Sequence, residues 1–284
     1  MFSTEEIQRA YEKVHDLLIT RHIIRTYSTN KQDIRDIALE DSQLSEFKTV
    51  LELGCGYGFF VEKLAGRLHE NAVIMGIDLV EKNREPFLNS VSASGFKGEF
   101  ISNDASIIKS MKPSSVDMVV CSYSLYFFSH LIPFIARILK DNGIFIALTH
   151  SKHSLEEALS FLPQCMQSIG FEIPGEMMIQ RLFSSFSSEN GRNKLGRSFG
   201  VVEKLKFNNS LVFNLENVDD CIYYLVKKRA LIYKEMVDID NDVVVKLESL
   251  LAQRIYALAA SQGKISLNKN DAVFRCSQPK RQDG

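Results

Sequence analysis

Apolar residues in the middle of the chain fall into short continuous runs, separated by glycine and polar turn residues. The runs cover residues 50–53, 73–78, 98–104, 116–122 and 143–149. Runs of this length between turns are typical of strands buried on both faces of a parallel sheet. The pattern therefore predicts an α/β fold with a mostly parallel sheet.

The N-terminal residues are predicted to be helical. Ser3 and Glu6 have the spacing of a capping box, in which each side chain bonds the backbone N–H of the other residue. A second short helix is expected over residues 31–39. The apolar residues that predict one amphipathic helix after the cap are Ile7, Tyr11, Val14 and Leu18.

The second half of the chain alternates between helical and extended patterns. We expect a helix over residues 154–168 that Pro163 bends or breaks, and irregular structure over 171–199. Extended structure should follow over 200–213. Two apolar stripes then indicate helices between Val218 and Gly263, before a last strand at 271–276. The stripes are Cys221, Ile222, Leu225 and Val226, and then Leu247, Leu251, Ile255 and Leu258.

The sequence VLELGCGYGFF at residues 50–60 joins a buried strand to a glycine turn. Gly54, Gly56 and Gly58 occupy alternating positions, and an apolar-periodic segment begins at Phe59. Glycine is needed where the backbone takes a positive φ or lies against a ligand without room for a Cβ. A helix after the turn would offer its N–H groups to an anionic ligand group. We expect a nucleotide-type pocket at the carboxyl edge of the sheet.

The glycine spacing distinguishes two kinds of nucleotide site. A dinucleotide fingerprint is G-x-G-x-x-G, whereas this chain has G-x-G-x-G, with Glu52 two residues before the first glycine. That pattern resembles motif I of the class I S-adenosyl-L-methionine (SAM)-dependent methyltransferases and argues against NAD. The resemblance covers roughly residues 48–150. It implies SAM as the cofactor and a seven-stranded, mostly parallel sheet with helices on both faces.

The resemblance also implies roles for individual residues. Asp78 ends the second apolar run, where a carboxylate can accept both ribose hydroxyls. Asp104 matches the acid that meets the adenine amino group, and Glu52 the acid that orients the cofactor or the loop. Asp78 and Asp104 can instead be helix N-caps, and Glu52 can form a structural hydrogen bond. The candidate cofactor-binding residues are Glu52, Gly54, Cys55, Gly56, Gly58, Asp78, Leu79, Asp104, Ala105 and Ser122.

Candidate catalytic residues follow the fourth and fifth strands. Methyl transfer from a sulfonium is an in-line displacement that needs positioning more than acid–base chemistry. The loop at 123–128 fits the one that faces the methyl donor in this family, so Tyr123, Tyr126 and Phe127 are candidate substrate residues. Tyr126 and His150 are candidate catalytic residues, since an oxygen nucleophile needs a base. Ordinary packing explains each of these side chains equally well. No acid cluster follows the fourth strand, so no metal is expected.

The long helical segment before the last strand is similar to the layout of small-molecule methyltransferases such as histamine N-methyltransferase. It can form a lid over the site or merely extend the core. On this basis the chain divides into an N-terminal helical cap (1–45), a SAM-binding core (46–150), the rest of the sheet with its loops (151–217), a helical insertion (218–263), and the last strand and tail (264–284).

The amino-acid composition bears on which classes of partner the protein binds and on where it is located. The chain has 284 residues, with 34 basic and 35 acidic side chains and a net charge of −1, which argues against nucleic acid as a partner. No apolar run approaches the roughly 20 residues of a membrane span, and the start MFSTEEIQ lacks a signal-peptide pattern. Five scattered cysteines without a C-x-x-C pair indicate reduced thiols and a cytoplasmic protein.

These observations favour a methyltransferase that acts at O or N of a small or medium organic molecule. A methyltransferase acting on protein or RNA stays open as an alternative. A catalytically inactive SAM-binding partner protein is another. The sequence carries no Asn-Pro-Pro-Tyr after the fourth strand, as in enzymes that methylate exocyclic amines of DNA bases, and no Pro-Cys pair of the RNA cytosine-C5 type. The sequence does not identify the methyl acceptor, because the residues that bind it come from variable caps and loops.

Overall fold

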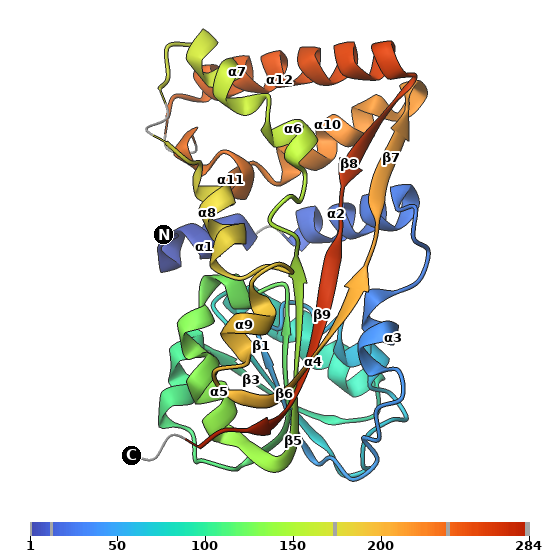
Figure 1. Ribbon diagram of the computed structural model, residues 1–284, viewed down its shortest axis with the longest axis vertical. Helices are drawn as coiled ribbons and strands as arrows, with labels where there is room; N and C mark the ends of the chain where they lie inside the picture. Colours follow the sequence, from blue (N-terminus) through green and yellow to red (C-terminus); the bar gives the residue numbers. More distant parts are fainter. Residues whose placement is uncertain (1, 12–13, 173–174, 237–238, 282–284) are drawn as a thin grey trace. The chain divides into compact units, whose positions relative to one another are not determined.

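A computed structural model describes residues 2–11, 14–172, 175–236 and 239–281. The chain forms two compact units, each assembled from three separate segments (Figure 1). Unit 1 comprises Met1–Lys31, Ser151–Ser184 and Asn208–Asn270, and unit 2 comprises Gln32–His150, Ser185–Phe207 and Asp271–Gly284. No helix of the described residues has the length and apolar character needed to cross a membrane.

Unit 2 is built around a seven-stranded sheet in the order β3-β2-β1-β4-β5-β9-β6. Strands β1 to β5 run parallel to their neighbours, whereas β9 is antiparallel to both β5 and β6. The predicted α/β fold with a mostly parallel sheet is confirmed. The strands are β1 Thr49–Leu53, β2 Val73–Asp78, β3 Lys97–Ser102, β4 Val116–Ser122, β5 Leu139–His150, β6 Phe199–Phe207 and β9 Asp271–Pro279.

Helices cover both faces of this sheet. Met118 and Val120 of β4 join a buried cluster with residues of α3 and α4, whereas Val119 and Cys121 point to the opposite face, because successive strand residues alternate. Helix α5 contacts β5, and α9 contacts β6 and β9. The α-helices are α3 Ile34–Leu39, α4 Arg84–Ala93, α5 Ile132–Ile138 and α9 Gly191–Leu195; the 3₁₀ turns are η1 Val61–Lys63, η2 Glu81–Asn83, η3 Ala105–Ser110, η4 Leu125–Phe127 and η5 Ser129–Leu131.

The strand order reverses between β1 and β4. From β1 the chain proceeds to β2 and β3 on one side, and from β4 to β5 on the other. Ligands of open α/β sheets bind outside the carboxyl ends of the strands at such a switch point. The glycine turn after β1 and the aromatic loop after β4 therefore lie where a ligand site is expected.

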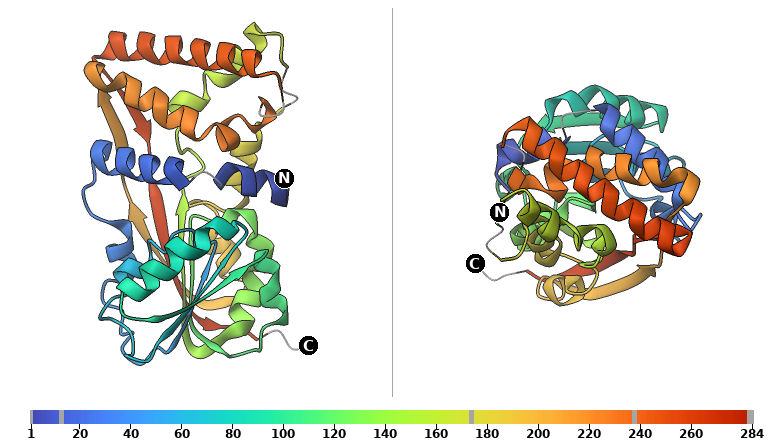
Figure 2. Two further views of the ribbon diagram at one scale, coloured as in Figure 1. Left: turned by 180° about the vertical axis from the view of Figure 1, so that it is seen from behind. Right: turned by 90° about the horizontal axis from the view of Figure 1, so that it is seen from above.

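Unit 1 combines helices with a two-stranded ribbon of β7 and β8. Helices α10 and α12 contact each other, and α12 also contacts β8 and α7 (Figure 2). The elements are α1 Thr4–Tyr11, α2 Val14–Tyr27, α6 Glu156–Leu159, α7 Leu162–Ser168, α8 Met178–Ser185 (its last residue in unit 2), β7 Ser210–Asn214, η6 Leu215–Asn217, α10 Val218–Lys227, α11 Arg229–Ile232, η7 Lys234–Met236, α12 Asn241–Gln262 and β8 Lys264–Asn268.

The predicted capping box is confirmed at the start of α1. The Ser3 N–H donates to Glu6 Oε2 at 2.6 Å, and the Glu6 N–H donates to Ser3 Oγ at 3.3 Å. Helix is described on both sides of residues 12 and 13, as α1 and α2, so whether one helix continues through them lies outside the described residues. Leu18 is 47% exposed, so it is not part of a buried apolar face as expected. Residues 12 and 13 and the Val14 side chain lie outside the described part of the chain.

The predicted break at Pro163 is confirmed. Two helices replace one, and Pro163 occupies the first turn of α7, where its missing N–H costs nothing. The irregular structure expected over 171–199 is wrong, since α8 and α9 lie there. Helix α8 buries Ile179, Leu182 and Phe183 on one face. The Ser- and Met-rich composition around this stripe obscured it.

The predicted helices between 218 and 263 are confirmed, and Gly263 ends α12 in the left-handed conformation with φ 73°. Leu247, Leu251 and Ile255 are buried as expected, but the stripe continues at Ala259 and not at Leu258. In α10, Cys221 and Leu225 are buried, whereas Ile222 and Val226 are only half-buried. Helices α10 and α12 contact each other within unit 1. Strand β8, directly after Gly263, was not expected. All five cysteines are buried and unpaired.

Candidate functional site

The glycine turn after β1 has the conformation that the sequence predicts. Gly54, Gly56 and Gly58 have φ values of 68°, 51° and 71°, a region that side chains disfavour. A Cβ on Gly54 would lie 2.6 Å from the Cβ of Ser124, so only glycine fits against the loop after β4. Cys55 between the glycines is buried.

The helix expected after the glycine turn is wrong. Only the 3₁₀ turn η1 forms there, followed by further turns up to Leu68. Gly66, with φ 70°, lies within this segment, in a conformation that no helix residue adopts. An anionic ligand group therefore finds no α-helix N-terminus at this turn, and other groups must hold it.

Glu52 lies at the buried end of β1. The residue is 2% exposed, and its Oε2 has no hydrogen-bond partner among the described residues. Burial raises the pKa of this carboxyl well above its usual range, although the charge of Arg35 opposes the shift. A buried acceptor without a donor is costly, so its persistence next to a ligand loop fits a role in binding a group that donates hydrogen bonds.

Asp78 at the end of β2 is held by three donors of the protein itself. Its Oδ2 accepts from the Gly56 N–H at 2.8 Å, and its Oδ1 accepts from the Val80 N–H at 2.9 Å and from Asn83 Nδ2 at 3.1 Å. Burial raises the pKa of Asp78, and these hydrogen bonds oppose the shift. A carboxylate offers about four acceptor positions, so about one is left for a ribose hydroxyl. Leu79, which follows, is half-buried.

Asn83 was missed by the sequence analysis. The residue is 2% exposed and lies beside the Asp78 carboxylate, and its buried Oδ1 has no hydrogen-bond partner within the described ranges. Tyr57 Oη is a third such atom in the glycine turn. Burial and the charge of Asp78 raise the pKa of Tyr57 to about 12, so the phenol stays protonated. No sequence motif marks Asn83, which reaches Asp78 only through the turn η2.

Asp104 and Ala105 lie at the start of η3. Asp104 is exposed and is the N-cap of this turn, because its Oδ1 accepts from the Ser106 N–H at 2.6 Å. Ala105 is buried. The backbone N–H of Asn103 donates to the Asp78 carbonyl at 3.0 Å, which places this segment beside the end of β2. Capping was one of the two readings of Asp104, and its contact with adenine stays a prediction.

The loop after β4 lies against the glycine turn. Ser122 ends β4, and Ser124 Oγ donates to the Leu53 carbonyl at 2.6 Å. Tyr123 has a positive φ of 60°, uncommon for a large residue. Tyr126 is buried and Phe127 is half-buried, with ring centroids 4.9 Å apart. Three candidate aromatic side chains therefore share this one loop.

His150 at the end of β5 is paired with Asp271, the first residue of β9. His150 Nδ1 and Asp271 Oδ1 are 2.8 Å apart, and the Tyr123 hydroxyl donates to Asp271 Oδ2 at 2.7 Å. The Tyr123 and His150 rings stack at 4.6 Å, and Tyr126 lies 6.0 Å from His150. The sequence identified the strand that Asp271 opens but not its pairing, which needs the antiparallel register of β9.

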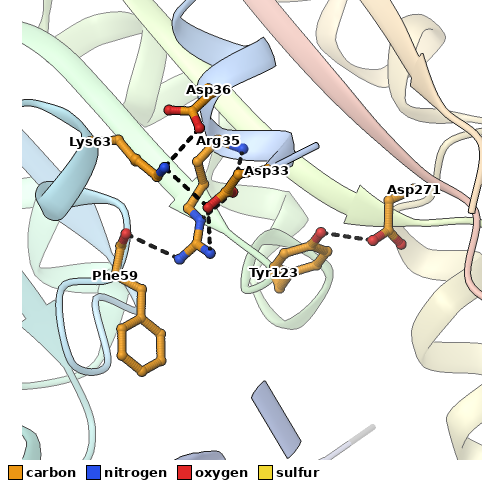
Figure 3. Close-up of polar contacts among 7 residues, drawn as sticks. All are labelled: Asp33, Arg35, Asp36, Phe59, Lys63, Tyr123 and Asp271. Carbon is orange, nitrogen blue, oxygen red and sulfur yellow. Dashed lines mark hydrogen bonds and ion pairs between the residues drawn. The ribbon is translucent and has the colours of Figure 1, made fainter. Parts of the chain in front are cut away.

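Arg35 from α3 reaches the glycine turn, and nothing in the sequence indicated this. Its Nη1 donates to the Phe59 carbonyl at 3.1 Å, and its Nε pairs with Asp33 Oδ1 at 2.8 Å (Figure 3). Lys63 joins the same network through Asp33 at 3.3 Å and Asp36 at 2.7 Å. The Arg35 charge is close enough to Glu52 and Tyr123 to lower the pKa of each, against the larger effect of burial.

The structure thus brings most of the predicted residues to one edge of the sheet. The glycine turn contacts Asp78 on one side and the loop after β4 on the other, Glu52 precedes the turn on β1, and His150 stacks on Tyr123 of the loop. Asp104 caps its own turn beside them. Within the described residues, no group of three or more His, Cys, Asp or Glu side chains is placed to hold a metal ion.

Comparison with known protein families now adds to this geometry. Residues 50–143 match a family model described as "Methyltransferase domain". This segment carries a SAM-dependent methyltransferase domain. The match includes the glycine turn, Asp78 and Asp104, whereas His150 and Asp271 lie outside it. The predicted resemblance to the class I SAM-dependent methyltransferases is confirmed for residues 50–143, and so is SAM as the cofactor of this domain.

Solved structures share the methyltransferase fold at low sequence identity. A protein of Bacillus halodurans described as a methyltransferase is 12% identical, with a TM-score of 0.50 over 87% of this chain and 99% of that one. Phosphoethanolamine N-methyltransferase 2 of Haemonchus contortus, in complex with phosphomonomethylethanolamine and S-adenosylhomocysteine, is 13% identical, with a TM-score of 0.51 over 99% of this chain and 61% of that one. The [4+2]-cyclase SpnF is 14% identical, with a TM-score of 0.53 over 99% and 98%. No curated protein matches the chain in sequence.

The buried polar atoms around the methyltransferase glycine turn fit the cofactor. Glu52 Oε2, Tyr57 Oη and Asn83 Oδ1 can all accept hydrogen bonds, and none of them has a hydrogen-bond partner in the part of the chain that the structure describes. SAM carries an amino group and two ribose hydroxyls, which are donors. Hydrogen bonds from these donors would satisfy the three acceptors, each of which otherwise costs about 1–3 kcal/mol to bury without a partner.

Proposed function

We propose that this methyltransferase transfers the methyl group of SAM to O or N of a small or medium organic molecule. The observation that carries the proposal is the recessed pair of His150 and Asp271 beside the aromatic loop. Their side chains are only 14% and 4% exposed. A compact molecule can bring its acceptor atom to such a recessed group.

Charge composition supports the same class of acceptor. A domain that binds RNA usually carries a basic excess, because phosphate contacts dominate affinity. This chain has a net charge of −1. The likeness to a phosphoethanolamine N-methyltransferase, at 13% identity, supports the fold alone and does not select the acceptor.

The residues of the chain divide the work between binding and positioning. SAM supplies a methyl group already activated by its sulfonium. Glu52, Asn83 and the one remaining acceptor position of Asp78 would hold it through hydrogen bonds. Tyr126 and Phe127 present rings to the acceptor, and aromatic faces also favour a nearby cationic group. Positioning of two reactants in this way accounts for most of what such a displacement requires.

Calorimetry tests the first half of the proposal. SAM and S-adenosylhomocysteine should bind, and NAD should not, because the glycine spacing is G-x-G-x-G. A double variant, Glu52→Gln with Asp78→Ala, is the matched control and should lose most of the SAM heat. Tight NAD binding without SAM binding would overturn the proposal.

Labelling tests the second half. The protein and SAM with an isotopically labelled methyl group are incubated with a cell extract, which is then separated into metabolite, RNA and protein fractions. The label should enter the metabolite fraction, and the double variant should abolish this. Label in RNA or protein would contradict the small-molecule acceptor while leaving the methyltransferase activity intact. Binding of SAM without transfer to any fraction would favour the inactive partner protein.

A further inference from the structure

Helix α2 is anchored in unit 1 by one of its faces. The Tyr27 ring lies 4.3 Å from the ring of Phe213 on β7, and its hydroxyl donates to Asp220 Oδ2 on α10. Towards the other end of α2, Asp16 pairs with Lys227 Nζ of α10 at 2.9 Å. This face consists of Asp16, Tyr27 and the buried residues Thr20 and Ile23. Contacts with α10 and β7 therefore fix how α2 is rotated within unit 1.

The opposite face of α2 lines a cavity of about 540 Å³. The lining residues are Leu18, Arg21, His22, Arg25 and Thr26. They share one side of the helix, because they follow one another at i, i+3, i+4, i+7 and i+8. Such a stripe is ordinarily apolar and packed against a core, yet here Arg21 is half-buried and the other four residues are exposed. A cavity of this volume is suited to a small molecule.

The face that lines the cavity carries positive charge. It presents the guanidinium groups of Arg21 and Arg25 together with the imidazole of His22. Lys31 adds an ammonium group close by, because its Nζ donates to the Thr26 carbonyl at 3.1 Å. The sequence of α2 contains a single acidic residue, and that residue pairs with α10 on the opposite face. Like charges at i and i+4 of a helix repel each other, and an anion bound between them lowers that repulsion.

The side chains of this face specify what kind of anion fits. A guanidinium presents a planar fork of donors that matches the oxygens of a carboxylate or phosphate group, and the His22 ring adds an N–H donor. Thr26 Oγ1 donates to the His22 carbonyl at 3.0 Å, so its hydrogen is already engaged. Leu18 is 47% exposed on the same face and offers an apolar contact. The matching ligand therefore combines an anionic oxygen group with an apolar portion.

We propose that this face of α2 binds a small organic anion, a carboxylate or a phosphate monoester, whose apolar portion contacts Leu18. Arg25 and His22 would hold the anionic oxygens, with the charge of Arg21 beside them. The residues of this site belong to unit 1, whereas the predicted cofactor-binding residues all belong to unit 2. Binding of the anion should therefore not require SAM, and this second ligand site goes beyond the proposed methyl transfer.

Calorimetry without SAM tests the class of ligand. The probes are phenyl phosphate, benzoate, the neutral benzamide and inorganic phosphate. Phenyl phosphate or benzoate should bind, the tighter of the two assigning the phosphate or the carboxylate class, and benzamide should not. Phenyl phosphate should bind more tightly than inorganic phosphate, because its ring reaches Leu18. Added salt should weaken binding, since exposed charges are screened beyond about 8 Å at physiological ionic strength.

Substitutions on α2 test which side chains hold the probe. Arg25→Gln should weaken binding of phenyl phosphate by about 5-fold, the upper end for an exposed ion pair. Adding His22→Gln should remove detectable binding, whereas Arg25→Lys keeps the charge and should retain most of the affinity. Leu18→Ala should weaken binding of phenyl phosphate and leave that of inorganic phosphate unchanged, because only the ring contacts this side chain.

A matched control exists on α12 of the same unit. Lys246 and Arg254 are exposed cations that do not line the cavity. The double variant Lys246→Gln with Arg254→Gln removes two positive charges from unit 1 and should leave binding of phenyl phosphate unchanged. Circular dichroism and the calorimetric affinity for S-adenosylhomocysteine should be the same in every variant, which shows that both units stay folded.

A local readout places the probe on α2. In protein labelled with ¹⁵N-histidine, the His22 signals are assigned by their loss in His22→Gln. Phenyl phosphate should shift these signals and leave those of His153 in place, whose side chain is also in unit 1 and is 51% exposed. Shifts confined to other histidines would put the site elsewhere.

Four further results would overturn the inference. Equal affinities for benzoate and benzamide, or no binding of any probe, would exclude recognition of an organic anion. Unchanged affinity in Arg25→Gln with His22→Gln would exclude α2 as the site. An equal loss in the α12 control would reduce the effect to net charge. Displacement of phenyl phosphate by a tighter-binding single-stranded RNA would replace the small ligand with nucleic acid. Failure to bind S-adenosylhomocysteine while phenyl phosphate still binds would instead refute the proposed function alone.

Discussion

The backbone N–H of Gly56 donates to Asp78 Oδ2 at 2.8 Å, so the glycine turn after β1 is fastened to the end of β2. Asp78 thereby combines two tasks. It stabilises the glycine turn, and about one of its roughly four acceptor positions is left for the ribose hydroxyl that we predict it to bind. Substitutions at Asp78 therefore act on the turn as well as on the ligand.

Asp78→Ala should weaken SAM binding by about 10- to 150-fold. Loss of a hydrogen bond to a charged group costs roughly 1.5–3 kcal/mol, and the Gly56 and Val80 N–H groups lose their acceptor as well. Calorimetry measures the affinity, and circular dichroism checks the fold. Asp78→Asn keeps one acceptor oxygen, so its SAM affinity should lie between those of the wild type and Asp78→Ala. Unchanged affinity in Asp78→Ala would mean that the residue serves only the turn.

Glu52→Gln should stabilise the free protein at alkaline pH. Burial raises the folded pKa of Glu52 well above its ordinary value of 4.5, so the folded state binds more protons than the unfolded chain above that pH. The contribution of Glu52 to stability is therefore fully present below about pH 4.5 and is lost as the pH rises through the folded pKa. The amide of the Glu52→Gln variant carries no charge, so the variant avoids the cost of burying a charged carboxylate at alkaline pH.

Melting temperatures measured across the pH range test the Glu52 prediction. The variant should melt higher than the wild type at about pH 8, and the difference should shrink towards about pH 4.5. Its SAM affinity should fall, because half of the carboxylate acceptor is replaced by a donor. A constant difference at all pH values would show that Glu52 is not the titrating group.

Gly54→Ala should cost more stability than Gly66→Ala. Both glycines have similar positive φ values, 68° and 70°, so both substitutions pay about 1–2 kcal/mol of backbone strain. A Cβ at Gly54 also meets the Cβ of Ser124 at 2.6 Å, whereas one at Gly66 meets nothing within 4 Å. Overpacking adds about 1–3 kcal/mol. The difference between the two variants in the free energy of unfolding, measured with urea, isolates the cost of the clash. Equal losses would show that Ser124 moves aside without cost.

Arg35→Ala should lower SAM affinity by about 10-fold. The guanidinium holds the Phe59 carbonyl, and a lost charged hydrogen bond of about 1.4 kcal/mol corresponds to that factor. Lys63→Met is the matched control, since it removes a cation from the same Asp33 network without touching the turn carbonyl. Calorimetry with S-adenosylhomocysteine compares the two. A larger loss of affinity in Lys63→Met than in Arg35→Ala would show that the net charge of the network, and not the bond to the Phe59 carbonyl, supports cofactor binding.

Residues 218–263 should behave as a structural extension and not as a lid. Helices α10 and α12 each bury several side chains and contact each other within unit 1, and well-packed helices exchange their amides slowly. Hydrogen exchange of α12 should be slow and unchanged by S-adenosylhomocysteine. The amides of 54–58 are the positive control and should become more protected. Ligand-dependent protection of α12 would restore the lid hypothesis.

Local patterns determined much of the fold in advance. The apolar runs gave the parallel strands, because a strand buried on both faces must be apolar throughout. The spacing of Gly54, Gly56 and Gly58 indicated the positive φ values that all three adopt. Ser3 with Glu6, Pro163 and Gly263 correctly marked a helix start, a break and an end. Each of these signals depends only on a few neighbouring residues.

The tertiary structure decided the contacts between distant residues. His150 meets Asp271 across 121 positions and Arg35 meets Phe59 across 24, which no local pattern encodes. The helix expected after the glycine turn did not form, since η1 is all that the segment supports before Gly66. The sequence by itself therefore determined the strands, the turn and the kind of cofactor, because backbone conformation and burial are local requirements. Only the register of β9 against β5 decided that His150 and Asp271 meet, because that pairing depends on the whole sheet.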